Sequence, residues 1–141
     1  MDPTLWNLLH DGKIERIEGT LPGDVSVHVR IGYLRKGFPG AGTGFVVHLS
    51  DCSQLTFTPH DQPGISDFSD IAALRPWIVD CEPSNPIEVH CAEGTLTLRY
   101  DTAALSLDSG ETITLSQLDA AATAYWDAWS ARHKATRQTD Q

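Results

Sequence analysis

Alternation of apolar and polar residues is the feature that most constrains how this chain can fold. In the stretch DVSVHVRI, the apolar residues Val25, Val27, Val29 and Ile31 are separated by polar residues. Successive side chains of a β-strand point to opposite faces, so a period of two indicates a strand with one face in a core and one in solvent. The pattern predicts a strand here, with IGYLR as its end.

Similar short runs recur along the chain and are separated by turn sequences such as LPGD, PSNP and DSGE. They predict further strands at 13–18, 45–52, 54–59, 77–82, 87–91, 95–100, 103–107 and 112–115. The run between residues 59 and 76 is irregular, and we expect a helical turn from Asp67 to Leu74 within it. Loops of this length in a compact domain are often functional.

Two segments have helical patterns. Residues 3–9 predict a short helix that ends at HDG. The long helix begins at TLSQ, where Thr114 or Ser116 is the expected cap and Gln117 completes a capping box with Thr114. An apolar stripe is expected to lie on the sheet, and it comprises Leu118, Ala121, Ala122, Tyr125 and Trp129.

Many short strands followed by one helix predict a mainly β (α+β) fold. We expect an antiparallel β-sandwich or curved sheet with one C-terminal helix packed on it, and a partly open β-barrel is the alternative. With 141 residues, the chain has the length of one domain. The prediction is a single globular domain at 1–135 and a frayed C-terminal tail at 136–141.

The charge of the chain limits its partners. Nineteen acidic side chains against ten basic ones give a net charge of -9. Such a surface repels the phosphates of nucleic acids and anionic membranes, and it attracts basic proteins or metal ions. Acidity also promotes solubility without any partner.

The sequence is expected to be that of a cytoplasmic protein. The start MDPTLWNLLHDG lacks the basic and apolar regions of a signal peptide, and no apolar run is long enough to span a bilayer. Cys52, Cys81 and Cys91 are odd in number and lack metal-knuckle spacing, so we interpret them as reduced core residues.

Three predicted strands carry a histidine at a polar position: His28, His48 and His90. Three imidazoles on adjacent strands could bind zinc with water as the fourth ligand. Histidine is also common at polar positions of a sheet, and that interpretation is favoured. A zinc module or metal-dependent enzyme is therefore the alternative function.

Three further patterns have chemical or structural interpretations. The glycines of GAGTG (40–44) precede a strand and not a helix, so a flexible connection is favoured over a phosphate loop. Acidic pairs at Asp67 with Asp70 and at Asp80 with Glu82 lack calcium-loop spacing and predict an acidic rim. Trp126 points about 100° away from Tyr125 on the helix, and it either covers a sheet edge or a loop or is an interface anchor, a role for which tryptophans are favoured.

The stretches LLHDG, PGD and IGYLR near the start, with AYWDAW near the end, resemble a family of small uncharacterised bacterial proteins. In size and acidity such proteins are similar to the immunity proteins that neutralise bacterial polymorphic toxins. The resemblance implies no catalytic residues. Under it, HDG is interpreted as a turn capped by Asp11, in preference to half of a catalytic pair of His10 with Asp11.

The favoured function is a non-enzymatic protein-binding protein of the bacterial cytosol, an immunity or adaptor protein that occludes a basic partner. Its surface would be acidic and aromatic, and the predicted contact residues are Asp67, Asp70, Asp80, Glu82 and Trp126. No cofactor is expected for this function.

Overall fold

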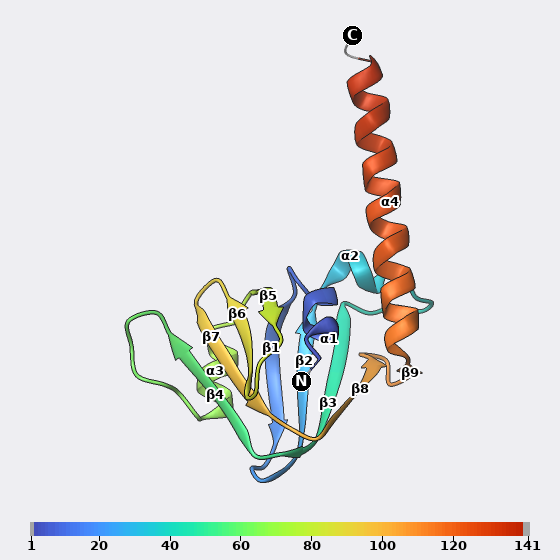
Figure 1. Ribbon diagram of the computed structural model, residues 1–141. Helices are drawn as coiled ribbons and strands as arrows, with labels where there is room; N and C mark the ends of the chain where they lie inside the picture. Colours follow the sequence, from blue (N-terminus) through green and yellow to red (C-terminus); the bar gives the residue numbers. More distant parts are fainter. Residues whose placement is uncertain (1, 140–141) are drawn as a thin grey trace.

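The computed structural model describes residues 2–139, and the side chains of residues 2–133. Two antiparallel sheets face each other (Figure 1). The first contains, in spatial order, β1 (Lys13–Gly19), β2 (Gly23–Arg30), β3 (Gly44–Cys52), β8 (Thr102–Leu107) and β9 (Thr112–Ile113). The second contains β4 (Gln54–Pro59), β7 (Gly94–Arg99), β6 (Ile87–Cys91) and β5 (Ile78–Glu82). The predicted fold class is confirmed, and the sheets do not close into a barrel.

The core lies between the sheets and follows from the alternation in the sequence. On β2 and β3, Val27 and Val47 are directly paired and both are fully buried. On the opposing sheet, Val89 and Leu96 are paired in the same way and are also fully buried. The apolar face of each sheet is therefore removed from water by the other, which is the main source of stability in such a fold.

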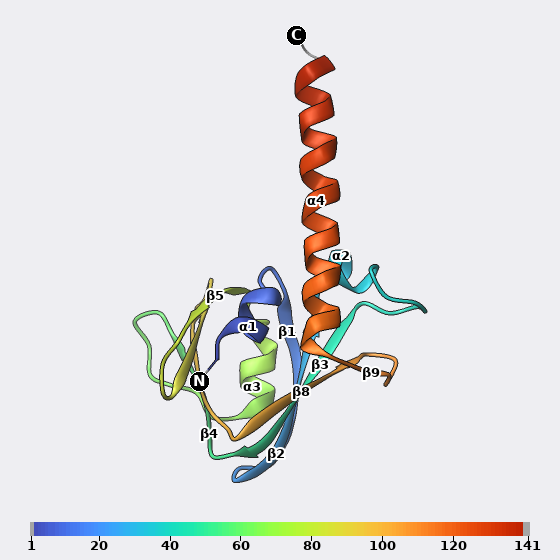
Figure 2. The same ribbon diagram turned by 45° about the vertical axis from the view of Figure 1, so that its right-hand side comes forward.

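Two short helices fill the space between the sheets, α1 (Thr4–Leu8) and α3 (Phe68–Ala73) (Figure 2). Trp6 of α1 is fully buried and donates from its indole nitrogen to the Tyr100 hydroxyl at 3.1 Å. The side chain of Asp67 caps α3 by accepting from the backbone N–H of Asp70. The helical turn predicted within residues 59–76 is thus confirmed.

The segment after β2 differs from the prediction. Gly32–Arg35 forms a short helix, α2, and does not extend the strand. The alternation that supports a strand stops at Ile31, whose N–H bonds to the Thr43 carbonyl, and the Arg35 N–H then bonds back to the Ile31 carbonyl. The prediction of a strand end at IGYLR was therefore wrong, because Arg35 is drawn inward by tertiary contacts that a local pattern does not contain.

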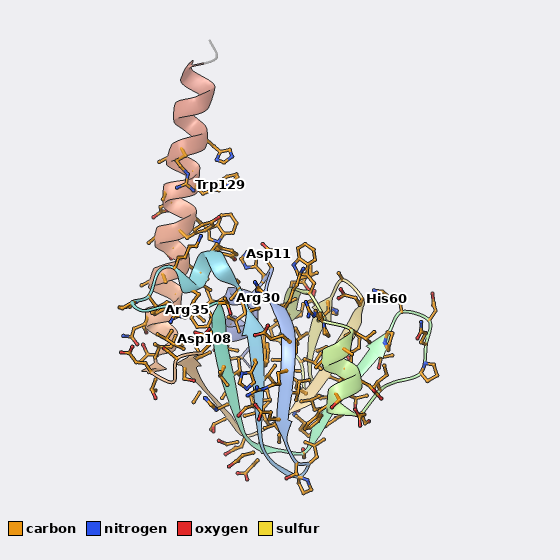
Figure 3. The ribbon with its side chains drawn as sticks, turned by 180° about the vertical axis from the view of Figure 1, so that it is seen from behind. Asp11, Arg30, Arg35, His60, Asp108 and Trp129 are labelled. Carbon is orange, nitrogen blue, oxygen red and sulfur yellow. The ribbon has the colours of Figure 1, made fainter. Side chains whose placement is uncertain are left out.

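Arg35 is the most buried charged residue among the described side chains, at 1% exposure. Its Nε atom donates to the Asp108 carboxylate at 2.9 Å, and Figure 3 shows the two side chains together. The remaining guanidinium nitrogens donate to three backbone carbonyls of the connection to β3, those of Phe38, Pro39 and Ala41. The glycine-rich connection is therefore anchored by a buried cation, whereas the sequence had suggested a flexible link.

Asp108 holds the other end of this connection. Its second carboxylate oxygen accepts from the N–H groups of Thr43 at 2.7 Å and Gly44 at 3.2 Å. A Cβ atom at Gly42 would overlap both Asp108 and Arg35, so glycine is required there. Burial alone would raise the pKa of Asp108, but the hydrogen bonds from Thr43, Arg35 and Gly44 hold that pKa below its usual range.

The long helix α4 (Leu115–Thr139) starts at the predicted capping box. Thr114 Oγ1 accepts from the Gln117 N–H at 3.1 Å, and Gln117 Oε1 accepts from the Thr114 N–H at 2.8 Å. Leu118 and Ala122 are buried, and the first half of α4 contacts α1 and α2, whereas its second half extends past the sheets (Figures 1 and 2). The predicted apolar stripe thus reaches the core only through its first turns.

The C-terminal prediction concerns residues 136–141. Residues 136–139 continue α4, and residues 140 and 141 lie outside the described part of the chain. Fraying of this tail stays a prediction. Across residues 2–139, no helix is both long enough and apolar enough to cross a bilayer.

Replacing Asp108 with asparagine should lower the free energy of unfolding by about 3 kcal/mol at pH 7, because the Arg35 cation would stay buried without its counter-ion. The folded pKa of Asp108 is depressed, so its contribution is present above the unfolded pKa of about 3.9 and is lost as pH falls through the folded value. Urea unfolding at pH 7 and pH 3 measures the free energy of unfolding of the unchanged protein and of Asp108→Asn. The difference between the two values should be smaller at pH 3.

The matched control is the exposed Asp101. Asp101→Asn should change the free energy of unfolding by less than about 0.5 kcal/mol. Equal losses in the two variants would contradict a structural role for the Arg35–Asp108 pair.

Candidate functional site

A row of ring contacts joins the end of α1, α2 and the part of α4 between Tyr125 and His133, and we call it the aromatic ladder. Its members are half-buried or exposed aromatic or imidazole side chains. They are His10, Tyr33, Tyr125, Trp126, Trp129 and His133.

Trp126 is the centre of the ladder. Its ring stacks on His10 of the α1 end at 5.7 Å and meets the edge of Tyr33 from α2 at 5.9 Å. Tyr125 packs on Tyr33 at 4.4 Å. Stacked and edge-to-face pairs at these separations are each worth about 0.5–1.5 kcal/mol beyond area burial. Trp126 therefore helps to fix the direction in which α4 leaves the sheets.

Hydrogen bonds hold the lower end of the ladder in place. The Tyr33 hydroxyl donates to the His10 carbonyl at 3.1 Å, and the His10 Nδ1 atom lies 2.7 Å from the Asn7 carbonyl. Burial, the Asp11 carboxylate and Tyr125 together raise the pKa of Tyr33 to about 12. Tyr33 is therefore a neutral hydrogen-bond donor at physiological pH and not a proton-transfer group.

The upper end of the ladder is open to solvent. Trp129 is 39% exposed, and its ring stacks on His133 with centroids 3.7 Å apart. Figure 3 shows Trp129 projecting from α4 beyond the sheets, on the side where Asp11 lies. An exposed indole with a fixed orientation is typical of a surface that binds another protein, because little side-chain entropy remains to be lost.

The four predicted acidic contact residues do not lie together. Asp67 caps α3 and lines a depression with Gly19, at the end of β1, and Leu21 of the following turn, and Asp70 lies on α3. Asp80 and Glu82 are exposed on β5, an edge strand. This strand lies nearer the ladder than α3 does. Cys81, between Asp80 and Glu82, is hydrogen-bonded through its backbone N–H and carbonyl to the side chain of Asn7 in α1.

The three predicted zinc ligands are on two different sheets. His28 and His48 lie on the neighbouring strands β2 and β3 and share the outer face of the first sheet. His90 lies on β6 and points outward from the second sheet, since Val89 and Cys91 beside it are buried. One ion cannot contact all three. Within the described residues, no group of three or more His, Cys, Asp or Glu side chains is arranged to hold a metal.

The outer face of the first sheet has a shallow polar depression of about 390 Å³ around His28 and His48. His28 Nε2 is 2.9 Å from the Glu18 carboxylate. His48 Nε2 is 2.9 Å from the Ser106 hydroxyl, and its Nδ1 is 3.3 Å from the Ser26 hydroxyl.

The Ser106–His48 pair resembles part of a hydrolase site in its spacing alone. A catalytic histidine is normally oriented by a carboxylate, which stabilises the imidazolium as it forms. Here the neutral Ser26 hydroxyl occupies that place. The pair is therefore better explained as cross-strand hydrogen bonding between β2, β3 and β8.

The cysteines are buried, as expected for core residues, and all three are free thiols. Burial, followed by the nearby charge of Glu93, raises the pKa of Cys91 to about 12. Burial and the neighbouring carboxylates Asp80 and Glu82 raise that of Cys81 to about 11. Protonated, inaccessible thiols are poor nucleophiles.

Comparison of the chain with protein-family models, with curated proteins and with solved structures finds no match. The resemblance to small bacterial proteins and to immunity proteins stays a prediction.

Sequence reasoning identified one member of the ladder, Trp126, and assigned Tyr125 and Trp129 to the core. The spacing of Tyr125, Trp126, Trp129 and His133 contains a usable signal, because residues three and four apart on a helix are neighbours. Nothing local in the sequence links Tyr33 to this helix, since that contact depends on the position of α2.

The zinc hypothesis has a direct test in calorimetric zinc titration of three single variants. His90→Ala should leave any zinc affinity unchanged within about twofold, because His90 is on the opposite outer face from the other two histidines. His28→Ala or His48→Ala should weaken binding if the outer face of the first sheet holds zinc at all. A tenfold or greater loss in His90→Ala would contradict this placement.

Proposed function

We propose that the chain is a non-enzymatic protein-binding protein of the bacterial cytosol, acting as an immunity or adaptor protein that occludes a basic partner. The observation that carries the proposal is Trp129, an indole held in a fixed stack and 39% exposed on a helix that extends past the sheets. The contact surface is the open side of the aromatic ladder.

The chemistry of the ladder supports a protein partner. Tryptophan and tyrosine dominate interface hot spots because each covers a large area with few rotatable bonds. Tyr33 and Tyr125 of the ladder are already packed against each other, so few side chains of this surface have to become ordered when a partner binds.

The charge of -9 supports a basic partner. Asp80 and Glu82 on β5 and the half-exposed Asp11 lie at the end of the molecule where α1 contacts β5 and the ladder. These carboxylates would speed the encounter, and the aromatic rings would supply the buried contact. Asp67 caps α3 and Asp70 lies on it, so in this proposal they add to the overall field and not to the contact.

The free cysteines support the cytosolic location, since reduced thiols persist in a reducing compartment. The buried and protonated thiols, and the neutral Ser26 hydroxyl as the partner of His48 Nδ1, support a non-enzymatic role.

The first test is a pull-down with the tagged protein from its native cell lysate at low and moderate salt, with mass spectrometry of what stays bound. The expected result is one stoichiometric basic protein that is lost as salt rises. That partner is then purified for affinity measurements.

Trp129→Ala should weaken binding of this partner by at least about 30-fold, the effect of a hot-spot loss of 2 kcal/mol or more. The matched control is Trp77→Ala. Trp77 is also exposed, at 43%, but it lies just before β5 and contacts Lys13 instead of the ladder. Isothermal titration calorimetry of both variants measures the difference, and equal effects would place the contact elsewhere.

Charge reversal tests the electrostatic half of the proposal. The double variant Asp80→Lys with Glu82→Lys should slow association about tenfold at low salt, and the effect should shrink at high salt because the charges are screened. Asp70→Lys is the control for an exposed carboxylate on α3 and should have a smaller effect. Stopped-flow rates that are unchanged in the double variant would contradict steering by β5.

A further inference from the structure

The edge of the first sheet at β8 is only partly covered. β9 has two residues, and they pair with the second half of β8, Ile113 with Leu105 and Thr112 with Ser106. The chain then leaves the sheet, because α4 begins at Leu115. In the described part of the chain, the first half of β8, from Thr102 to Ala104, therefore has no strand on the side away from β3.

The backbone at this edge is oriented for pairing. The Asp108 N–H bonds to Gly44 on the β3 side, and the Leu107 N–H bonds to Glu111 on the β9 side. Backbone groups of successive residues in an antiparallel strand alternate between its two sides. The N–H and carbonyl of Ala103, four residues before Leu107, thus point to the open side.

A cavity of about 450 Å³ opens beside this edge. Its apolar lining comes from α1, β8, β9 and the start of α4, and it includes Leu5, Ala103, Leu105, Ile113 and Leu115. Volumes of this size are typical of ligand sites.

The side chain of Ala103 points toward the cavity and is not covered by the second sheet. Ala103 pairs with Leu49 of β3, and directly paired residues share a face. Leu49 is 1% exposed in the core, whereas Ala103 is exposed on the same face. A residue added opposite Ala103 on a new strand would share that face too, so its side chain would enter the cavity.

Two carboxylates beside the cavity favour a positively charged ligand. Asp2 and Asp101 are exposed and line the same cavity. An apolar side chain in the cavity would thus be flanked by acidic groups, which complements lysine or arginine at the neighbouring positions of the added strand.

We propose that the open edge of β8 binds an extended basic peptide segment, in line with β9, with its backbone paired to Ala103 and an apolar side chain in the adjacent cavity. This is strand addition at a sheet edge, in which backbone hydrogen bonds give affinity and a pocket for alternate side chains gives specificity. The site is separate from the aromatic ladder and does not depend on the proposed function of that surface.

The test is a two-dimensional amide NMR titration of the full-length labelled protein. The probe is an acetylated and amidated heptapeptide in which lysine alternates with apolar residues, with leucine at its centre. Saturable shifts are expected at the amides of Ala103 and Leu105. Replacing the central leucine with serine, or all lysines with glutamate, should weaken binding at least tenfold.

Two variants test the pairing and the cavity separately. Ala103→Pro removes the N–H that points to the open edge, a change that edge strands tolerate. Ala103→Phe keeps this N–H and fills the cavity. Each variant should weaken binding of the heptapeptide at least tenfold. Ala103→Phe keeps the proposal testable if Ala103→Pro lowers the thermal midpoint of unfolding.

Three outcomes would overturn the proposal. One is binding that persists in Ala103→Phe. Another is a set of chemical-shift changes confined to the indole signals of Trp126 and Trp129, which would show that the peptide binds to the ladder. The third is an Ala103 shift that depends on protein concentration without peptide, which would make a second copy of the chain the occupant of this edge.

Discussion

The buried guanidinium of Arg35 is the interaction on which one end of this molecule depends. A charge at 1% exposure is tolerated only because Asp108 neutralises it and three backbone carbonyls accept its other hydrogen bonds. This arrangement ties the connection before β3 to the end of β8 and fixes α2 above the first sheet. Tyr33, on α2, can then pack on Tyr125, so the position of the ladder depends on a salt bridge whose partners, Arg35 and Asp108, are 73 residues apart in the sequence.

The point at which the chain leaves the first sheet accounts for both proposed surfaces. The capping box of Thr114 and Gln117 starts α4 directly after two residues of β9. Because the helix starts so early, it carries Trp126 and Trp129 away from the sheets. For the same reason, no strand within residues 2–139 pairs with the first half of β8 on the side away from β3. A longer β9 would cover Ala103 and close the edge.

Much of the fold could be predicted because its determinants are local. The alternation around Val27, the turn residues and the capping box at Thr114 act within a few residues, and the structure has the corresponding strands and helix start. Less of the candidate site could be predicted. The role of Trp126 as a partner contact stays a prediction, and its ring contacts with His10 and Tyr33 join segments more than ninety residues apart in the sequence.

The sequence by itself determined that two apolar sheet faces must be buried against each other and that a capped helix follows the last strand, because periodicity and capping are properties of neighbouring residues. Only the tertiary structure decided that His90 faces away from His28 and His48, that IGYLR turns into a helix and that α4 extends beyond the sheets. These outcomes depend on strand order and on burial of Arg35, which are set by the free energy of the whole packed chain and not by any one segment of it.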